Sequence, residues 1–296
     1  MSQNSDIQII ECPRDAMQGI KPFIATEKKI DYLNALLKVG FETLDFGSFV
    51  SPKAIPQMQD TREVLAGLDL SNTKTKLLAI VANVRGGDDA CSYQEIDYLG
   101  FPFSISETFQ QRNTNKSIAQ SFETVKELHD LAQRSGKELV VYISMGFGNP
   151  YGEDWNVEIV EAWVDKMARL GIKTISLSDT IGTSTPESIT YLFSHLIPKY
   201  PQITFGAHLH TTARTWREKV DAAYNAGCRR FDSAIKGYGG CPLAQNELCG
   251  NMATENMLSF AANKKLNTGL NTLAFESAYN QAIRTFPQEE NLRKPL

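Results

Sequence analysis

The sequence predicts an α/β fold, a (β/α)8 TIM barrel with extra helices after the barrel. Eight short apolar segments rich in β-branched residues recur along the chain, and stretches with helical apolar spacing lie between them. Strands that alternate with helices form a parallel sheet, and about eight such units close into a barrel. An open doubly wound sheet is the alternative, but no Gly-x-Gly-x-x-Gly motif follows the first predicted strand.

The predicted elements follow one another in a regular order. Strands are expected at residues 7–11, 41–47, 76–81, 98–105, 138–144, 174–179, 203–210 and 229–235. Helices are expected at residues 26–39, 60–68, 88–95, 117–133, 155–170, 186–196 and 214–225. Helix stop signals stand where this alternation requires them, at Gly40, Gly136, Gly171 and Gly227. Thr185 followed by Pro186 is typical of a helix start, because a hydroxyl caps the first turn and proline fits within it.

The length of 296 residues fits one large domain. A value of about 150 residues per domain would suggest two domains, but α/β barrels of roughly 250 residues are the usual exception. We therefore predict a single catalytic TIM-barrel domain over residues 1–296. The barrel is expected at about residues 7–250, and C-terminal helices are expected at about residues 253–285.

Composition narrows the classes of function. The formal net charge of −4 gives no basic surface for nucleic acid, so we expect no nucleic-acid partner. The N-terminus lacks the charged and apolar regions of a signal peptide, and no apolar run reaches the ~18 residues of a membrane span. The five cysteines are odd in number and scattered, which favours reduced thiols in a cytoplasm. We expect a cytoplasmic protein with no membrane partner.

Polar residues follow several predicted strands, where a parallel barrel carries its chemistry. The first strand is followed by Arg14, Asp15 and Gln18, and the second carries Asp45 and Ser48 at its end. The fourth ends beside Ser106 and Glu107, the sixth at Asp179, and the seventh at His208 and His210. A loop with Cys241 follows the eighth strand. The sequence therefore predicts one polar rim at which these side chains converge.

His208 and His210 are the strongest candidate for a metal site. Alternate residues of a strand point to one face, so both imidazoles are expected to leave the backbone in the same direction. With Asp15 and an amide oxygen they form a mixed nitrogen and oxygen set for a divalent cation such as Mg²⁺ or Mn²⁺. Zinc is disfavoured, because no cysteine spacing supports a tetrahedral site. The alternative is a pair of core histidines satisfied by neighbouring hydrogen bonds.

Arg14 beside this cation suits a substrate that chelates through oxygen atoms and develops negative charge, since a guanidinium stabilises an enolate oxygen. The alternative for Arg14 and Asp15 is a surface salt bridge. Cys241 lies between a Gly-Gly pair and a proline, on a loop able to fold over a ligand. We interpret it as an acid/base carried by that loop, and a small packed residue is the alternative.

Six motifs, in register from about residue 7 to about residue 260, resemble the hydroxymethylglutaryl-CoA lyase family. They are Arg14-Asp15 with Gln18, Ser48-Phe-Val-Ser-Pro-Lys53, Ser104-x-Ser106-Glu107, Asp179-Thr-Ile-Gly-Thr with Pro186, His208-x-His210, and Gly239-Gly-Cys241-Pro242 with Gly250-Asn251. The Gly-Gly-Cys-Pro loop separates these lyases from their condensing relatives. Two departures are Asp45, where the family has Glu, and Thr211, where the family has Asp.

The resemblance implies cleavage of 3-hydroxy-3-methylglutaryl-CoA, or a close 3-hydroxy acyl-CoA, to acetyl-CoA and acetoacetate, as in leucine degradation. It implies a divalent cation held by Asp15, His208, His210 and Asn251. It further implies catalytic roles for Arg14, Cys241, Asp45 and Asp179, and substrate binding by Gln18, Ser48, Ser106 and Glu107. The family also suggests a homodimer.

Two other functions stay open at the level of sequence. A Claisen-condensing acyltransferase of the isopropylmalate or citramalate synthase type shares an Arg-Asp start and a His-x-His. A catalytically silent barrel could serve as a scaffold or ligand sensor, and the changes at Asp45 and Thr211 are its only support.

Overall fold

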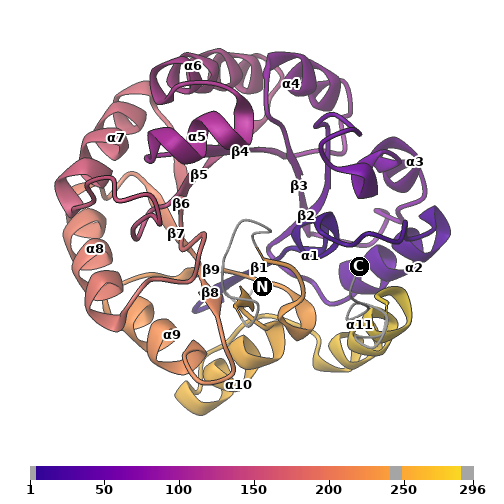
Figure 1. The fold of residues 1–296 in the computed structure, drawn as a ribbon. Helices are drawn as coiled ribbons and strands as arrows, with labels where there is room; N and C mark the ends of the chain where they lie inside the picture. Colours follow the sequence, from indigo (N-terminus) through magenta and orange to yellow (C-terminus); the bar gives the residue numbers. More distant parts are fainter. Residues whose placement is uncertain (1–4, 241–248, 288–296) are drawn as a thin grey trace, which may run out of the picture.

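The structure is a computed structural model that describes residues 5–240 and 249–287. In these residues, parallel strands form a closed barrel in the order β1-β2-β3-β4-β5-β6-β7-β9, with helices arranged around it (Figure 1). The barrel strands are β1 (Gln8–Glu11), β2 (Thr43–Ser48), β3 (Lys76–Ile80), β4 (Tyr98–Ser104), β5 (Glu138–Ser144), β6 (Thr174–Ser178), β7 (Thr204–His208) and β9 (Arg230–Ser233). The predicted TIM barrel is confirmed, and each predicted strand overlaps one strand of the barrel.

The helices between the strands are α2 (Thr26–Leu37), α3 (Thr61–Ala66), α4 (Val84–Cys91), α6 (Ile118–Arg134), α7 (Val157–Leu170), α8 (Pro186–Lys199) and α9 (Trp216–Asn225). The four predicted glycine stops all adopt positive φ, as a left-handed turn at the end of a helix requires. Thr185 caps α8, and its hydroxyl accepts a hydrogen bond from the backbone N–H of Ser188. Helix α4 begins four residues before its predicted start, because Asn83 caps it.

The sequence patterns missed several short elements. Helix α1 (Pro13–Gln18) follows β1, and helix α5 (Glu107–Thr114) follows β4. Two 3-10 turns, η1 (Pro56–Met58) and η2 (Ile235–Gly237), lie in the loops after β2 and β9. Each is short and shows little helical periodicity, and none of them was predicted as a helix.

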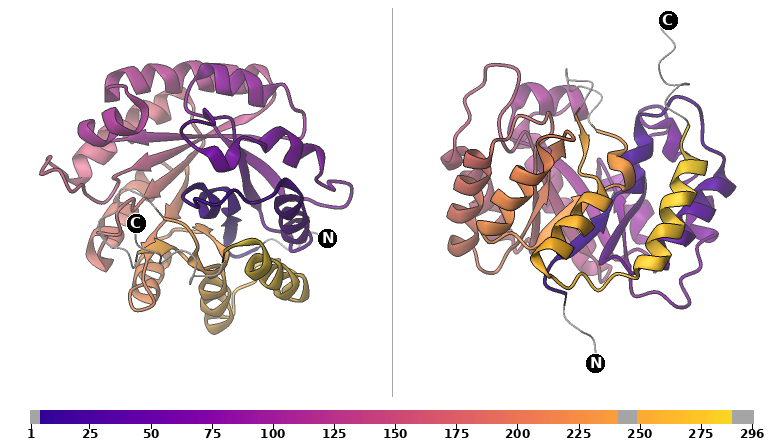
Figure 2. Two further views of the ribbon diagram at one scale, coloured as in Figure 1. Left: turned by 45° about the vertical axis from the view of Figure 1, so that its right-hand side comes forward. Right: turned by 90° about the horizontal axis from the view of Figure 1, so that it is seen from below.

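Two further helices complete the outer ring, α10 (Thr254–Lys264) and α11 (Thr272–Thr285), as the C-terminal prediction requires. Helix α11 packs against α2, so a helix from the C-terminal part of the chain lies beside the first long helix (Figures 1 and 2). The rings of Tyr32 and Phe286 meet edge to face at a centroid distance of 5.6 Å. The backbone N–H of Asn271 donates to the carbonyl of Val39 over 2.9 Å.

Most buried apolar side chains lie between the strands and the outer helices. A second, smaller cluster fills the barrel interior with Leu78, Ile80, Val140 and Tyr142. Near the mouth of the barrel, the other interior side chains are polar, so a binding site for a polar ligand can form there.

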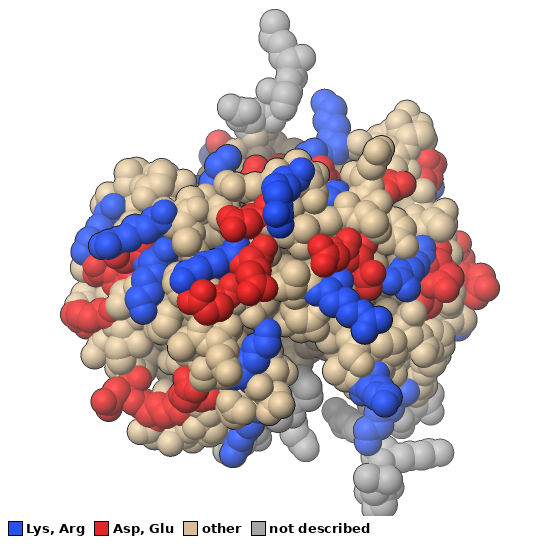
Figure 3. Space-filling model, turned by 90° about the horizontal axis from the view of Figure 1, so that it is seen from above, with Lys and Arg blue, Asp and Glu red and all other residues tan. Residues whose placement is uncertain are grey.

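The surface has no large area of one sign on the face shown in Figure 3, where acidic and basic side chains are interspersed. Among the helices of the described ranges, none combines the length and the apolar character that crossing a bilayer requires.

Candidate metal centre and active site

A cavity of about 390 Å³ opens at the carboxyl ends of the barrel strands. Arg14, Asp15, His208 and His210 form its polar wall. Val50, Ile55, Ile80, Phe109 and Tyr142 are among its apolar lining residues. Part of the predicted polar rim and an adjoining apolar surface therefore meet in one cavity.

The two histidines come from different strands. Strand β7 ends at His208, and His210 begins a short strand, β8 (His210–Thr211). Strand β8 pairs antiparallel with β10 (Gly250–Asn251), and His210 lies opposite Asn251 in that ladder. The prediction of one continuous strand through residue 210 was wrong, because the backbone leaves the barrel sheet after His208. The new pairing ties His210 directly to Asn251.

Asp15, His208 and His210 form a group suited to a metal ion, because their ligand atoms all lie within 4.8 Å of one another. Both ring nitrogens of His210 are buried and have no hydrogen-bond partner among the described residues. The amide nitrogen of Asn251 donates to Asp15 Oδ2 over 2.7 Å, which brings the fourth predicted ligand to the same place. Buried imidazole nitrogens are costly when unpaired, so the donor set fits a bound cation.

The electrostatics favour the ionisation states that a cation requires at His210 and Asp15. Burial by itself would lower the pKa of His208, but Asp232 and Asp15 outweigh it and raise that pKa above its usual value. Burial lowers the pKa of His210 to about 4, and His208 adds to this effect, so the His210 ring is neutral near pH 7. Burial by itself would raise the pKa of Asp15, but Arg14 and His208 outweigh it and lower that pKa below its usual value. A neutral imidazole beside a carboxylate is ready to bind a metal without prior loss of a proton.

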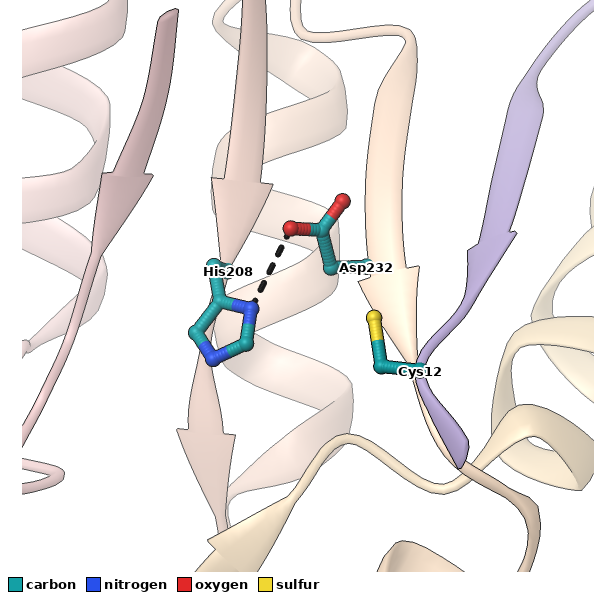
Figure 4. Close-up of side chains that lie close together, drawn as sticks. All are labelled: Cys12, His208 and Asp232. Atoms are coloured by element: carbon teal, nitrogen blue, oxygen red, sulfur yellow. Dashed lines mark hydrogen bonds and ion pairs between the residues drawn. The ribbon is translucent and has the colours of Figure 1, made fainter. Parts of the chain in front are cut away.

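A second group, Cys12 with His208 and Asp232, is also close enough to hold an ion and shares His208 with the first (Figure 4). In this group His208 Nδ1 already pairs with Asp232 Oδ2 over 3.1 Å. Burial, followed by the charges of Asp232 and Asp45, raises the pKa of Cys12 well above its usual value. A protonated thiol is a poor ligand, so the donor chemistry favours the Asp15 group.

Arg14 is held at the edge of the cavity by a two-pronged ion pair. Its Nε and Nη2 donate to the carboxylate of Asp45 over 3.1 and 2.6 Å. Its Nη1 donates to Asp15 over 3.0 Å and to Gln18 over 2.8 Å. Burial raises the pKa of Asp45 to about 6, although Arg14 opposes this effect. The arrangement holds a cationic side chain beside the candidate metal ligands.

Asp179 is fully buried and does not line the cavity. Its Oδ2 accepts a hydrogen bond from Lys219 over 2.7 Å, and its Oδ1 accepts one from the backbone N–H of Ser184 over 3.0 Å. Lys219 also donates to the carbonyl oxygens of Gly182 and His210. Asp179 therefore connects the loop after β6 to the backbone of a candidate metal ligand.

The predicted substrate-binding residues divide into two sets. Gln18 lines the cavity. The hydroxyl of Ser48 donates to the carbonyl of Ile80 and accepts from the backbone N–H of Val50. The hydroxyl of Ser106 caps α5. The exposed carboxylate of Glu107 accepts a hydrogen bond from the backbone N–H of Ile118. None of these three is among the residues that line the cavity, and their bonds hold the loops that surround it.

Cys241 lies outside the described residues, so its predicted role stays a prediction. The chain that precedes it passes directly over the site. A Cβ atom at Gly239 would lie 2.7 Å from the carbonyl oxygen of Asp15 and 2.9 Å from the amide of Asn251. Glycine is required here, because the backbone has a φ of +87° and no space for a side chain.

Sequence reasoning missed several residues that the structure brings to the site. Arg230 and Asp232 alternate within the fully buried strand β9, and two charges on one face of a predicted barrel strand were an available signal. Tyr142 packs against His208 with a centroid distance of 5.9 Å. Lys219 gave no signal, because a lysine in an amphipathic helix is usually solvated.

The family model described as HMGL-like matches residues 6–281 of this chain. The chain belongs to the HMGL-like family. A hydroxymethylglutaryl-CoA lyase of Bacillus subtilis is 32% identical to this HMGL-like chain over 284 residues, which cover 96% of this chain and 92% of that relative. The human mitochondrial hydroxymethylglutaryl-CoA lyase is 31% identical over 90% of this chain and 81% of its own.

Solved structures agree with the family assignment. The HMG-CoA lyase of Bacillus subtilis superposes with a TM-score of 0.89 at 31% identity, over 100% of this HMGL-like chain and 97% of that one. An HMG-CoA lyase from Acinetobacter baumannii, in complex with coenzyme A and 3-methylmalate, has a TM-score of 0.85 at 31% identity. That match covers 94% of this chain and 91% of the other.

Proposed function

We propose that this chain is a carbon–carbon lyase that cleaves 3-hydroxy-3-methylglutaryl-CoA to acetyl-CoA and acetoacetate with the aid of a divalent cation. The observation that carries the proposal is the convergence of Asp15, His208, His210 and Asn251 beside Arg14 in one cavity of an HMGL-like protein. Relatives at about one-third identity along most of the chain carry the name of this lyase.

The cation would be held by Asp15, His208, His210 and Asn251, and we expect Mg²⁺ or Mn²⁺. When bound, it would act as a Lewis acid toward the oxygen atoms of the substrate. A mixed imidazole, carboxylate and amide set favours such a cation over one that prefers thiolates.

The reaction requires a proton to leave the tertiary hydroxyl group as the neighbouring carbon–carbon bond breaks. We assign the acceptance of that proton to the thiolate form of Cys241, the acid/base carried by its loop, which thereby becomes a thiol. The electron pair of the broken bond moves onto the thioester and forms the enolate of acetyl-CoA, while the hydroxyl carbon becomes the ketone of acetoacetate. Arg14 stabilises the enolate oxygen by charge and hydrogen bonding, and Asp45 holds the guanidinium in place. The thiol then returns the proton to the enolate carbon.

The contacts of Gln18 and Asp179 support different roles for these two residues. Gln18 is positioned to contact substrate, since it lines the cavity and bonds Arg14. Asp179 would act through the protein rather than on the substrate, because Lys219 and Ser184 occupy its carboxylate. The homodimer and the cytoplasmic location stay predictions.

The test is an assay of acetyl-CoA release from hydroxymethylglutaryl-CoA, first with Mg²⁺ or Mn²⁺ and then with EDTA. We expect release that depends on the metal. Formation of a condensation product from acetyl-CoA and a 2-oxo acid, without this release, would favour the synthase alternative. A folded, metal-loaded protein that performs neither reaction would refute the proposal and favour a ligand sensor.

A further inference from the structure

Asp232 lies beside His208, on the neighbouring strand β9. Strands β7 and β9 are paired in parallel, with Gly206 opposite Arg230 and Ala207 opposite Phe231. One residue further along both strands, His208 Nδ1 and Asp232 Oδ2 are 3.1 Å apart (Figure 4). The Asp232 side chain is fully buried, so this contact is shielded from water.

Arg230 holds the Asp232 carboxylate from its other side. Its Nη1 donates to Asp232 Oδ1 over 2.9 Å, and the Arg230 side chain is only 6% exposed. The hydroxyl of Ser176 on β6 donates to Asp232 Oδ2 over 3.1 Å. The carboxylate is thus bound from three barrel strands, β6, β7 and β9.

The barrel provides space for this arginine through Gly206. A Cβ atom at Gly206 would lie 2.5 Å from Arg230 Nη1 and 3.1 Å from Ser176 Oγ. Any larger residue at this position would force the guanidinium away from the carboxylate. The arginine and the glycine on the neighbouring strand therefore form one complementary pair.

The charges of this group fix which nitrogen of His208 carries a proton. Asp232 faces the cation of Arg230, so it is ionised and acts only as an acceptor. The nitrogen that faces it, Nδ1, must then carry a proton, so in the neutral ring the lone pair is on Nε2. In Figure 4 this second nitrogen points away from Asp232.

We propose that Arg230 and Asp232 are positioning residues that hold His208 in its Nδ1–H tautomer and direct Nε2 toward the divalent cation, an inference that rests on the proposed metal-dependent function. A carboxylate behind a ligating histidine fixes the orientation of the ring and increases its basicity. Arg230 and Ser176 each donate a hydrogen bond to that carboxylate and hold it in place against the ring.

The tautomer can be measured directly. The chain contains four histidines, so protein labelled with ¹⁵N-histidine gives few ring signals, and His208→Gln assigns those of His208. At a pH where the His208 ring is neutral, we expect the Nδ1–H tautomer in the unsubstituted, metal-free protein, and loss of that preference in Asp232→Asn. An Nε2–H tautomer in the unsubstituted protein would overturn the inference.

Metal affinity gives the second readout, by titration with Mn²⁺ alone and no substrate. We expect Asp232→Asn and Arg230→Met each to weaken Mn²⁺ binding by about 10- to 100-fold. The matched control is Asp97→Asn, which removes an exposed ion pair with Lys76 and should leave Mn²⁺ binding unchanged. Unchanged affinity in a folded Asp232→Asn protein would contradict the inference.

Each single variant leaves an unpaired charge in the barrel and could prevent folding. The double variant Arg230→Met with Asp232→Asn removes both charges, and we expect it to fold and to show the same loss of affinity. Retained Mn²⁺ affinity in the folded double variant would overturn the inference. Absence of Mn²⁺ binding in the unsubstituted protein would instead refute the proposed metal-dependent function, while the tautomer measurement still decides the role of Asp232.

Discussion

Arg14 and Asp45 form a two-pronged ion pair across the mouth of the barrel, with Nη2 and Oδ2 2.6 Å apart. The Asp45 side chain is 1% exposed and the Arg14 side chain is 10% exposed, so the pair is shielded from solvent on its Asp45 side. Helix α1 carries Arg14 and strand β2 carries Asp45, so the pair also joins the first two barrel units. The direction of the guanidinium is therefore set by a residue that does not itself line the cavity.

Replacement of Asp45 by Ala should release Arg14 and lower kcat for hydroxymethylglutaryl-CoA cleavage by about 100-fold, because the enolate would lose a fixed cationic donor. The affinity for Mn²⁺ should change little, since Asp45 is not among the proposed ligands. Steady-state kinetics and Mn²⁺ titration separate the two effects. Asp45→Glu is the matched control that restores the carboxylate, and we expect it to recover most of the activity. Full activity in Asp45→Ala would contradict the proposed role of the ion pair.

His210→Ala should reduce the affinity for Mn²⁺ by about 10-fold or more, because it removes a ligand whose ring nitrogens have no hydrogen-bond partner in the described part of the chain. The rise in Tm on addition of metal should shrink accordingly, since a ligand stabilises the folded state by mass action. His195→Ala is the control, because His195 is 38% exposed and pairs with Glu161 away from the site. Equal metal-induced Tm shifts in the two variants would remove His210 from the ligand set.

Lys219→Met should lower the free energy of unfolding by about 3–5 kcal/mol, because it leaves the carboxylate of Asp179 buried without its cation. The control is Lys76→Met, whose side chain is 51% exposed and whose pair with Asp97 should contribute less than about 1 kcal/mol. Urea unfolding measures both values. A loss at Lys219 no larger than that at Lys76 would show that the buried pair does not anchor the loop.

Cys241→Ser should lower kcat by orders of magnitude and leave Mn²⁺ binding unchanged, since a hydroxyl is a far weaker acid/base than a thiol near neutral pH. Kinetics with metal-loaded protein, together with Mn²⁺ titration, test this expectation. Cys228→Ser is a control for general thiol loss, because Cys228 is buried in the barrel wall and bonds backbone carbonyls. Normal turnover in Cys241→Ser would exclude the thiol from the reaction.

Buried Glu11 should make the free energy of unfolding depend on pH. Burial raises the pKa of Glu11 from 4.5 to about 8, although hydrogen bonds from Thr254 and Ile235 oppose this effect. Between these two values the folded chain holds a proton that the unfolded chain has released, so stability should fall as the pH rises through this range. Glu11→Gln should remove this component, and its stability relative to the unsubstituted protein should increase from about pH 5 to about pH 9. Urea unfolding across that range is the measurement, and parallel curves for the two proteins would contradict it.

The strand and helix order followed from the sequence because each depends on local periodicity. The expected strand at residues 138–144 matches β5 (Glu138–Ser144), since a run of apolar residues fits a buried parallel strand. Short elements contain too few residues to show such a periodic pattern of apolar side chains. Helix α1 has only six residues, yet it carries Arg14 and Asp15 into the site. The break between His208 and His210 was also invisible, because it depends on pairing with Asn251 far along the chain.

The sequence by itself determined the barrel, its C-terminal helices and the set of polar residues at its mouth. Hydrophobic spacing and strand-end polarity are local properties that can be taken directly from the residues. Only the tertiary structure decided that Asp45 holds Arg14, that Lys219 holds Asp179, and that Arg230 and Asp232 stand behind His208. These contacts join residues from different strands and helices, so they exist only once the barrel has closed and their charges have been withdrawn from water together.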